Sequence, residues 1–240
     1  MLANQINMAR MKHGPYGPIV GKLGNTVGYI RLGEACVRTL TPPNKNKIFT
    51  QNQIAAFDKM RVFMEFLSPI NTFTNTSFKL AVKGTNKIAQ NAAVSSNIKT
   101  AIKGVYPNLE LDYPKIIVSK GDLSPAQNPV ISHIVEAPIN KKALYTNVSL
   151  KFQWDIDPTW DNDLKRDQVM LLAYLPDNKT AFYKLSGSRR SEGEDTLEGS
   201  IAIKNLGNTI KDRFIETYIA FISDDRESIS DSIYTGRIVL

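Results

Sequence analysis

The segment Val148-Ser149-Leu150-Lys151-Phe152-Gln153-Trp154 indicates the fold class of the C-terminal half of the chain. Its apolar and polar side chains alternate, and a period of two places them on opposite faces of a half-buried β-strand. Other strand-like runs are residues 115–119, 130–136, 168–175, 181–185, 197–203, 214–222 and 232–240. Eight short strands separated by turn residues predict a β-sandwich. Trp154 lies on an early-middle strand without a cysteine pair, so within the immunoglobulin-like sandwiches a fibronectin-like domain is the closer analogy.

Upstream of these strands, the apolar residues have helical spacing. Thr50-Gln51-Asn52-Gln53 is a capping-box pattern. In this pattern a side-chain hydroxyl and a side-chain amide accept hydrogen bonds from the backbone N–H groups that are left without partners at the start of a helix. Apolar residues then recur every three or four positions until Ser68-Pro69, namely Ile54, Phe57, Met60, Met64 and Leu67. Phe63 and Phe66 widen this stripe, so the end of the helix must be buried. A second helical region is expected over residues 72–104, with Gly104 as its stop.

The first 50 residues hold six of the fourteen glycines, with short apolar pieces between them. Glycines spaced in this way separate short strands, and Leu32-Gly33-Glu34 is typical of a turn. We expect an extended arm that ends in a small hairpin and has little core of its own. The predicted architecture is therefore α+β, with a basic arm and hairpin over residues 1–50, a helical module over 51–107 and a β-sandwich over 108–240.

The net charge of +7 is unevenly distributed along the chain. Residues 1–50 carry seven lysines and arginines against Glu34 alone, a charge of +6, and residues 51–120 carry +5. Residues 121–240 carry −4. The basic half can face a polyanion such as nucleic acid, or it can face the acidic half of a neighbouring copy. Composition does not separate these two alternatives.

Several classes of protein are disfavoured by the sequence. No run approaches the about 18 apolar residues of a membrane-spanning helix, and the first residues lack the apolar stretch of a signal peptide. We therefore expect no membrane partner and a location in the cytoplasm or within a phage-like particle. A single cysteine, Cys36, excludes an intramolecular disulfide framework, and two histidines with one cysteine make a zinc site improbable.

Candidate chemistry is sparse. Gly17-Pro18-Ile19-Val20-Gly21-Lys22 has the wrong spacing for a phosphate loop, and Leu23 replaces its Ser/Thr. Cys36 could act as a nucleophile with His13 or His133, but its apolar neighbours favour a buried structural thiol. We therefore predict no catalytic residue, no cofactor and no small-molecule substrate. The aspartates of Asp155–Asp163 either bind calcium or cap turns, and the EF-hand spacing is missing.

Two sets of lysines have helical spacing: Lys79, Lys83 and Lys87, then Lys99 and Lys103. On a helix each set would form one basic face. Such a face is either simply solvated or contacts the phosphate backbone of a nucleic acid without reading bases.

Some of these features recur together in a known family. The residues concerned are Gly17, Gly21, Lys22, Gly24, Asn25, Val27, Gly28 and Tyr29, followed by Gly33, Arg38, the segment Gly104-Val105-Tyr106-Pro107 and the closing segment Ser230-Asp231-Ser232-Ile233-Tyr234-Thr235-Gly236. Over nearly its whole length the chain resembles a large family of uncharacterised proteins from Bacteroidota, described as a domain of unknown function. The resemblance implies a bacterial, non-secreted protein with no assigned activity, catalytic residue or cofactor. Glu34-Ala35-Cys36 departs from the small basic or aromatic stretch that the resemblance implies.

An arm, an apolar helical module and a sandwich of opposite charge suit a subunit of a regular assembly. We expect a non-enzymatic, self-assembling structural protein, such as a shell, tube or tail component of a phage- or prophage-derived particle. In this homo-oligomer the arm would lock a neighbour through Gly17, Gly21, Lys22, Gly24, Asn25, Val27, Gly28, Tyr29 and Arg38. The alternative is a sequence-independent nucleic-acid-binding protein that uses Lys79, Lys83, Lys87, Lys99 and Lys103.

Overall fold

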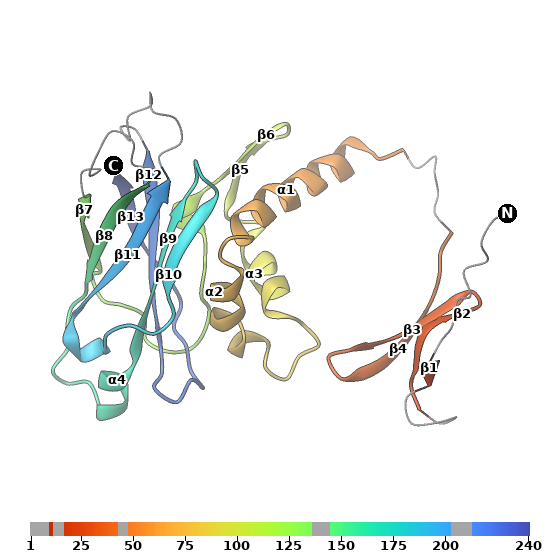
Figure 1. Cartoon of the computed structure of the whole chain (residues 1–240), viewed down its shortest axis with the longest axis horizontal. Coiled ribbons are helices and arrows are strands. Elements are labelled where there is room, and N and C mark those ends of the chain that lie inside the picture. Colours follow the sequence, from red (N-terminus) through yellow and green to blue (C-terminus); the bar gives the residue numbers. More distant parts are fainter. Residues whose placement is uncertain (1–9, 12–16, 43–47, 136–144, 203–212) are drawn as a thin grey trace. The chain divides into compact units, whose positions relative to one another are not determined.

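The computed structural model describes residues 10–11, 17–42, 48–135, 145–202 and 213–240. Four strands come first, a run of helices follows, and most of the remaining elements are strands; all of the described strand pairs are antiparallel (Figure 1), so the expected α+β class is confirmed. The chain divides into two compact units, residues 1–50 and residues 51–240, each of which is described by itself. In the part of the chain that the structure describes, no helix has both the length and the apolarity needed to cross a membrane.

The N-terminal unit is a four-stranded sheet with its strands in sequence order. The strands are β1 (Arg10–Met11), β2 (Ile19–Leu23), β3 (Thr26–Arg31) and β4 (Glu34–Thr39). The predicted turn at Leu32-Gly33 joins β3 to β4, and both residues have positive φ, +51° and +87°. Two positive φ angles in a two-residue loop match the right-handed twist of the flanking strands, so the expected hairpin is confirmed.

The helical part of the second unit begins with α1 (Gln51–Leu67), which ends directly before the predicted stop at Ser68-Pro69. Phe63, Phe66 and Leu67 at its C-terminal end are buried, as the widened apolar stripe requires. After it come α2 (Asn71–Ser77), the short 3₁₀ helix η1 (Leu80–Val82) and α3 (Ala89–Asn97).

The expected helical region over residues 72–104 is divided into short helices, and its last part, residues 98–104, is not helical. In α2 the hydroxyl of Thr74 donates to the carbonyl oxygens of Ile70 and Asn71, and such local bonds disfavour longer helices. Gly84 has φ +75°, which interrupts the path between η1 and α3. The end of this region lies instead in a hairpin of β5 (Ile102–Val105) and β6 (Asn108–Leu111), where Gly104 has φ +89°.

Two larger sheets complete this unit. One has the order β10-β9-β12-β13, with β9 (Gln168–Leu175), β10 (Thr180–Lys184), β12 (Phe214–Ile222) and β13 (Ile233–Val239). The other has the order β11-β8-β7, with β7 (Val130–Val135), β8 (Tyr145–Gln153) and β11 (Glu194–Ala202). Short helices lie at η2 (Tyr113–Lys115), α4 (Asn162–Arg166) and η3 (Arg190–Glu192). Seven of the eight expected strands are confirmed.

The eighth expected strand, residues 115–119, is wrong. This segment begins in η2, and its backbone then forms hydrogen bonds with a serine side chain instead of a ladder with a neighbouring strand. The backbone N–H groups of Val118 and Ser119 donate to the hydroxyl of Ser232, and the Ser119 hydroxyl donates to the carbonyl oxygen of Ser230. These bonds satisfy the backbone without a β-ladder, so the apolar pattern alone could not reveal the difference.

Strand β9 lies between two separate apolar cores. Met170, Leu172 and Tyr174 pack with Phe63, Phe66 and other helical residues, and the alternate residues Val169, Leu171 and Ala173 pack with Val148, Leu150 and Phe152 of β8. Figure 1 shows the order of layers that results: helices, the four-stranded sheet, then the three-stranded sheet. Because both faces of β9 and β12 are covered, these strands are apolar at nearly every position.

A buried polar network stabilises the four-stranded sheet beside the helices. The Glu216 carboxylate on β12 is fully buried and accepts bonds from the Tyr234 hydroxyl at 2.6 Å and from Arg237 Nη2 at 2.6 Å. The Tyr218 hydroxyl donates to the carbonyl oxygen of Tyr113 at 2.9 Å, which connects η2 to the sheet. Burial raises the pKa of Tyr218 well above its ordinary value, so this hydroxyl stays a donor.

Candidate assembly surfaces

The glycines of the N-terminal sheet have backbone roles. Gly21 and Gly28 are direct partners of β2 and β3, and a Cβ on Gly28 would lie 2.0 Å from the carbonyl oxygen of Ile19. Gly24 has φ +56° in the turn between these strands. No other residue fits at Gly28 without moving β2, so the glycine spacing first serves the close approach of two strands.

Strand pairing divides the side chains of β3 and β4 between two faces. Paired residues of an antiparallel ladder share a face, and faces alternate along each strand. One face, called here the apolar face, carries Leu23, Thr26, Ile30, Ala35 and Val37. The other, called here the basic face, carries Lys22, Val27, Tyr29, Cys36 and Arg38.

Among the described residues of this sheet, none forms a buried core beneath the apolar face. Leu23, Ile30 and Val37 are 55%, 46% and 64% exposed. Among residues 17–42 no apolar side chain is buried. A sheet of this size needs a covered hydrophobic face for independent stability, so this face is a candidate contact surface.

The predicted subunit-contact residues all lie in this sheet or directly before it. Gly17 precedes β2, Gly21 and Lys22 lie in β2, and Gly24 and Asn25 form the turn. Val27, Gly28 and Tyr29 lie in β3 and Arg38 in β4. The pairing brings Lys22, Val27, Tyr29 and Arg38 together on the basic face. Their contact with another subunit stays a prediction.

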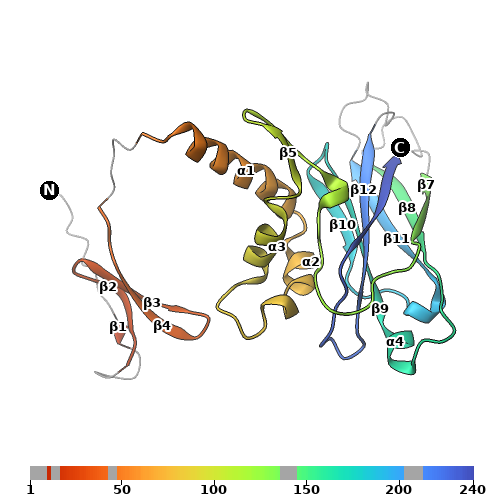
Figure 2. The ribbon, with the colours of Figure 1, turned by 180° about the vertical axis from the view of Figure 1, so that it is seen from behind.

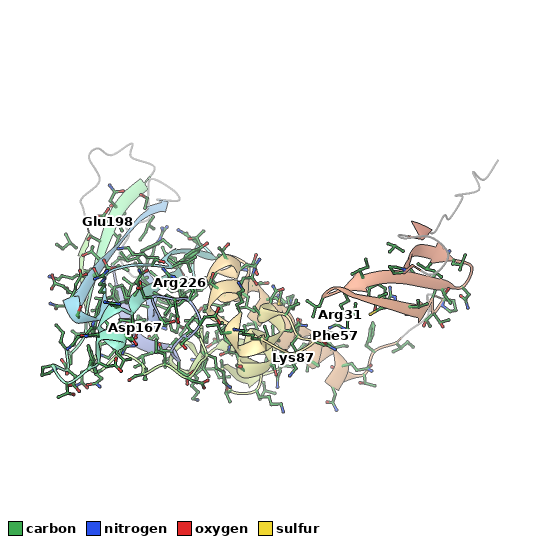
Figure 3. The ribbon with its side chains drawn as sticks, turned by 90° about the horizontal axis from the view of Figure 1, so that it is seen from below. Arg31, Phe57, Lys87, Asp167, Glu198 and Arg226 are labelled. Carbon is green, nitrogen blue, oxygen red and sulfur yellow. The ribbon has the colours of Figure 1, made fainter. Side chains whose placement is uncertain are left out.

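The two edges of the three-stranded sheet differ sharply. On β11, the Lys184 ammonium donates to the carbonyl oxygen of Thr196 at 2.6 Å and to Asp195 Oδ1 at 2.8 Å. The same Asp195 oxygen accepts the N–H of Thr196 at 2.7 Å. Both backbone groups of Thr196 are thus bonded by charged side chains, which is a common way to block an edge strand. Glu198 lies farther along the same strand (Figure 3).

At the other edge, β7 has no comparable protection. It lies at the margin of the sheet in both ribbon views (Figures 1 and 2), and among the described strands it pairs only with β8. Val130 and Ile134 are 60% and 69% exposed. The strand Val130–Val135 contains no lysine, arginine, aspartate, glutamate or proline. An exposed apolar edge of this kind invites pairing with another chain.

The five predicted lysines do not form helical faces, so that expectation is wrong. Lys79 and Lys83 flank the three-residue η1, and Lys87 lies in the connection to α3 (Figure 3). Lys99 follows α3, and Lys103 lies in β5. Lys83 also bonds Glu227, and this bond raises the lysine pKa. The prediction from helical spacing is wrong because η1 ends after one turn, so Lys79, Lys83 and Lys87 do not share one helix.

The aspartates of residues 155–163 mostly bond their own loop. Asp157 Oδ1 accepts the N–H and the hydroxyl of Thr159 at 2.8 and 2.6 Å, and the hydroxyl bond lowers the Asp157 pKa. Asp161 accepts the N–H of Leu164 at 2.8 Å and caps α4. Asp155 accepts a bond from Asn128. These bonds match the turn-capping interpretation.

A buried ion pair was not foreseen in the sequence. Arg190 is fully buried and donates to Asp167 Oδ2 at 3.1 Å and to the carbonyl oxygen of Ser124 at 2.7 Å, and its guanidinium lies 3.9 Å from the ring centre of Phe221. Burial raises the pKa of Asp167 to about 6, and Arg190 opposes this shift. Asp167 (labelled in Figure 3) also lines a cavity of about 410 Å³, together with Asp161, Asp163, Asp224 and Asp225. The local sequence, Ser188-Arg189-Arg190-Ser191, contains no pattern that distinguishes a buried arginine from an exposed one.

The remaining chemical candidates have simple structural surroundings. Residues 19–22 of the phosphate-loop-like segment lie in β2, not in a loop before a helix, so that resemblance has no structural basis. Cys36 is partly exposed on β4 rather than buried, and its thiol lies 3.9 Å from the carbonyl oxygen of Glu34. His133 is exposed on β7, and His13 lies outside the described residues.

Comparison with known proteins identifies a family without an assigned activity. No curated protein matches the chain, and no solved structure matches it. A family profile matches residues 14–236, which include β2 to β4 of the N-terminal sheet, the described helices and both larger sheets except the end of β13. The chain therefore belongs to DUF6266, a family of unknown function.

Proposed function

We propose that this chain is a non-enzymatic, self-assembling structural protein in which the N-terminal sheet of one copy locks onto a neighbouring copy. The observation that carries this proposal is the apolar face of that sheet. Its leucine, isoleucine and valine are about half exposed or more, although they lie on paired strands where such side chains are normally covered. A second copy supplies the missing cover in every subunit of a repeating assembly.

The charge distribution supports a second copy as the partner. Residues 1–50 carry +6 and residues 121–240 carry −4, so identical chains attract when the N-terminal sheet of one approaches the C-terminal half of another. Such a contact joins two different surfaces and is therefore heterologous, which generates rings or open tubes. Shell, tube or tail components of phage- or prophage-derived particles are the class of structure that we propose.

The finer fold assignment belongs to the same proposal. We propose that residues 108–240 form an immunoglobulin- or fibronectin-like β-sandwich that serves as the rigid body of the subunit. The shared core of Val148, Leu150 and Phe152 with Leu171 and Ile219 supports this assignment. Trp154 lies in that core 5.4 Å from Phe221, and its indole N–H donates to the carbonyl oxygen of Arg190.

Size-exclusion chromatography with light scattering, followed by negative-stain electron microscopy, tests the proposal. We expect regular rings, tubes or shells that survive nuclease treatment. Val37→Asp places a charge on the apolar face and should abolish them. Val239→Asp is the matched control, because Val239 is similarly exposed on β13 and lies outside the N-terminal sheet. A monodisperse monomer of the unmodified chain at high concentration contradicts the proposal.

The same experiment separates assembly from nucleic-acid binding in the cytoplasm, the alternative function. In that case the large particles vanish after nuclease treatment, and binding weakens steeply as salt increases. Alanine at Lys79, Lys87 and Lys99 would then reduce binding. We expect this triple variant to assemble like the unmodified chain.

A further inference from the structure

We infer that strand β7 of one copy accepts strand β4 of a neighbouring copy, so that the three-stranded sheet continues into the neighbour's N-terminal sheet. This inference rests on the proposed function and names the contact through which the copies join. The occupant is a second copy because its β4 is also an edge strand, has the same six-residue length and belongs to the basic half of the chain.

The backbone of β7 is oriented for this addition. The N–H of Trp154 donates to the carbonyl oxygen of Gly193, so even-numbered residues of β8 point their backbone groups at β11. Odd-numbered residues of β8 therefore face β7, where Lys151 is the partner of Ser132. The even-numbered residues of β7 thus bond β8, and the backbone groups of Ile131 and His133 point to the open edge.

The same reasoning applies to β4. Leu40 donates its N–H to the carbonyl oxygen of Asn25, which places even-numbered residues of β4 on the side of β3. The backbone groups of Ala35 and Val37 therefore point to the free edge of the N-terminal sheet. Open-edge residues must lie opposite each other in an antiparallel ladder, so Ala35 and Val37 face His133 and Ile131.

This pairing also matches the side-chain faces. The apolar face of the N-terminal sheet continues the side of β7 on which Ile131 packs against the core. The basic face continues the polar outer side, which carries Ser132, Lys151 and Glu194. A one-residue slip would reverse both faces, so the hydrophobic pattern opposes it.

Charge and the proline before β7 select one register from those that remain. A shift by two residues toward the start of β7 would place Val37 opposite Pro129, which has no N–H to donate. With Cys36 opposite Ser132, Arg38 lies opposite Val130, near the exposed Asp155 that bonds Asn128. A shift by two residues in the opposite direction would move Arg38 opposite Ser132 and beside Lys151, a like charge. The favoured register also leaves Cys36 and Ser132 as a non-hydrogen-bonded pair, with Cα atoms about 4.5 Å apart.

The single native cysteine allows a direct test by mild oxidation of the full-length assembly and non-reducing electrophoresis. Ser132→Cys should form intermolecular disulfides with Cys36 and yield a ladder of linked chains, because the Cα spacing suits a disulfide. His133→Cys is the matched control: it is adjacent and exposed, but its side chain lies on the opposite face. We expect several-fold more linked chain for Ser132→Cys than for His133→Cys.

Two further variants distinguish the outcomes. Ser132→Cys combined with Cys36→Ser should give no ladder, and a linked dimer there would show that β7 pairs with β7 and would overturn the inference. His133→Pro removes an edge N–H without removing a bond to β8, so it should abolish assembly at an unchanged melting temperature. Regular particles without linkage of Ser132→Cys would overturn this contact and leave the proposed function intact. Failure of the unmodified chain to assemble would overturn both.

Discussion

At the residue scale, Arg190 is a fully buried charged side chain, so its guanidinium needs partners within the protein. Its guanidinium is removed from water and satisfied by Asp167, the backbone of residues 124–125 and the ring of Phe221. The backbone N–H of Arg190 also donates to the carbonyl oxygen of Asp167 at 2.7 Å. A buried pair of this kind fixes the connection between β9 and η3, and removal of one partner leaves the other charge uncompensated.

Replacement of Arg190 by Met should therefore lower the free energy of unfolding at pH 7.5 by about 3–5 kcal/mol. Urea unfolding followed by tryptophan fluorescence measures this loss. The loss should be smaller near pH 4.5, where Asp167 becomes protonated and no longer needs a counter-charge. An equal loss at both pH values would contradict the assigned pairing.

Asp167 should also impose a pH dependence of its own. Its pKa is about 6 in the folded chain, because of burial, against about 3.9 when unfolded. The folded state thus binds the proton more tightly than the unfolded state does. Protonation of Asp167 therefore adds its full contribution to the free energy of unfolding below about pH 4, and this contribution is lost as the pH rises through about 6. Asp167→Asn removes this titration. We expect the unmodified chain to lose stability relative to Asp167→Asn between pH 4.5 and 7.5, as measured by urea unfolding.

At the element scale, α1 shows what the sequence could predict. Its start, its end and its buried C-terminal half follow from apolar spacing and a proline stop. The region after it could not be predicted equally well from the apolar spacing. In α2 a threonine hydroxyl bonds the backbone, and Gly84 and Gly104 have positive φ angles, which end helical structure. The same interruptions of the helix separate Lys79, Lys83 and Lys87, although these lysines have helical spacing in the sequence.

The packing of α1 gives a stability prediction. Phe66 is fully buried, with its ring centre 4.7 Å from that of Tyr174 on β9. Phe66→Ala should lower the free energy of unfolding by about 3–5 kcal/mol. Met60→Ala on the same helix is the control, because Met60 is exposed and should change stability only slightly. Similar losses in the two variants would mean that the end of α1 is not packed on β9.

The close approach of β2 and β3 at Gly28 gives a prediction for the N-terminal sheet. Gly28→Val places a side chain against the backbone of Ile19 and should disrupt this sheet. Both apolar cores consist of residues beyond position 60, so the melting temperature should remain unchanged while assembly is lost. Thr180→Val places the same side chain at an exposed position of β10, outside the N-terminal sheet, and should preserve assembly. Differential scanning fluorimetry and light scattering measure the two effects.

The candidate surfaces illustrate the limits of sequence analysis at this scale. The glycine motif indicated the N-terminal hairpin correctly, but the division into an apolar and a basic face required the strand register. The contrast between β11 and β7 depends on where Lys184 reaches across to Thr196. No local pattern encodes such a contact, because the two residues belong to different sheets.

At the scale of the whole molecule, the opposite charges of the two chain ends should make assembly sensitive to salt. Attraction between +6 and −4 segments is screened over a Debye length of about 10 Å at 0.1 M salt. The dissociation constant from sedimentation velocity should therefore rise several-fold between 0.05 and 0.5 M sodium chloride. Apolar contacts alone would leave it unchanged or lower it, and that result would contradict charge-guided association.

The blocked edge of β11 sets the valence of the subunit. Lys184 prevents growth of the three-stranded sheet on that side, so in the proposed contact each molecule has β7 as its one acceptor strand and β4 as its one donor strand. In the language of polymer chemistry such a monomer is bifunctional: it propagates as a linear chain or closes into a ring, and it cannot branch. Lys184→Ala would add a second acceptor, and the expected product is a cross-linked gel in place of discrete particles.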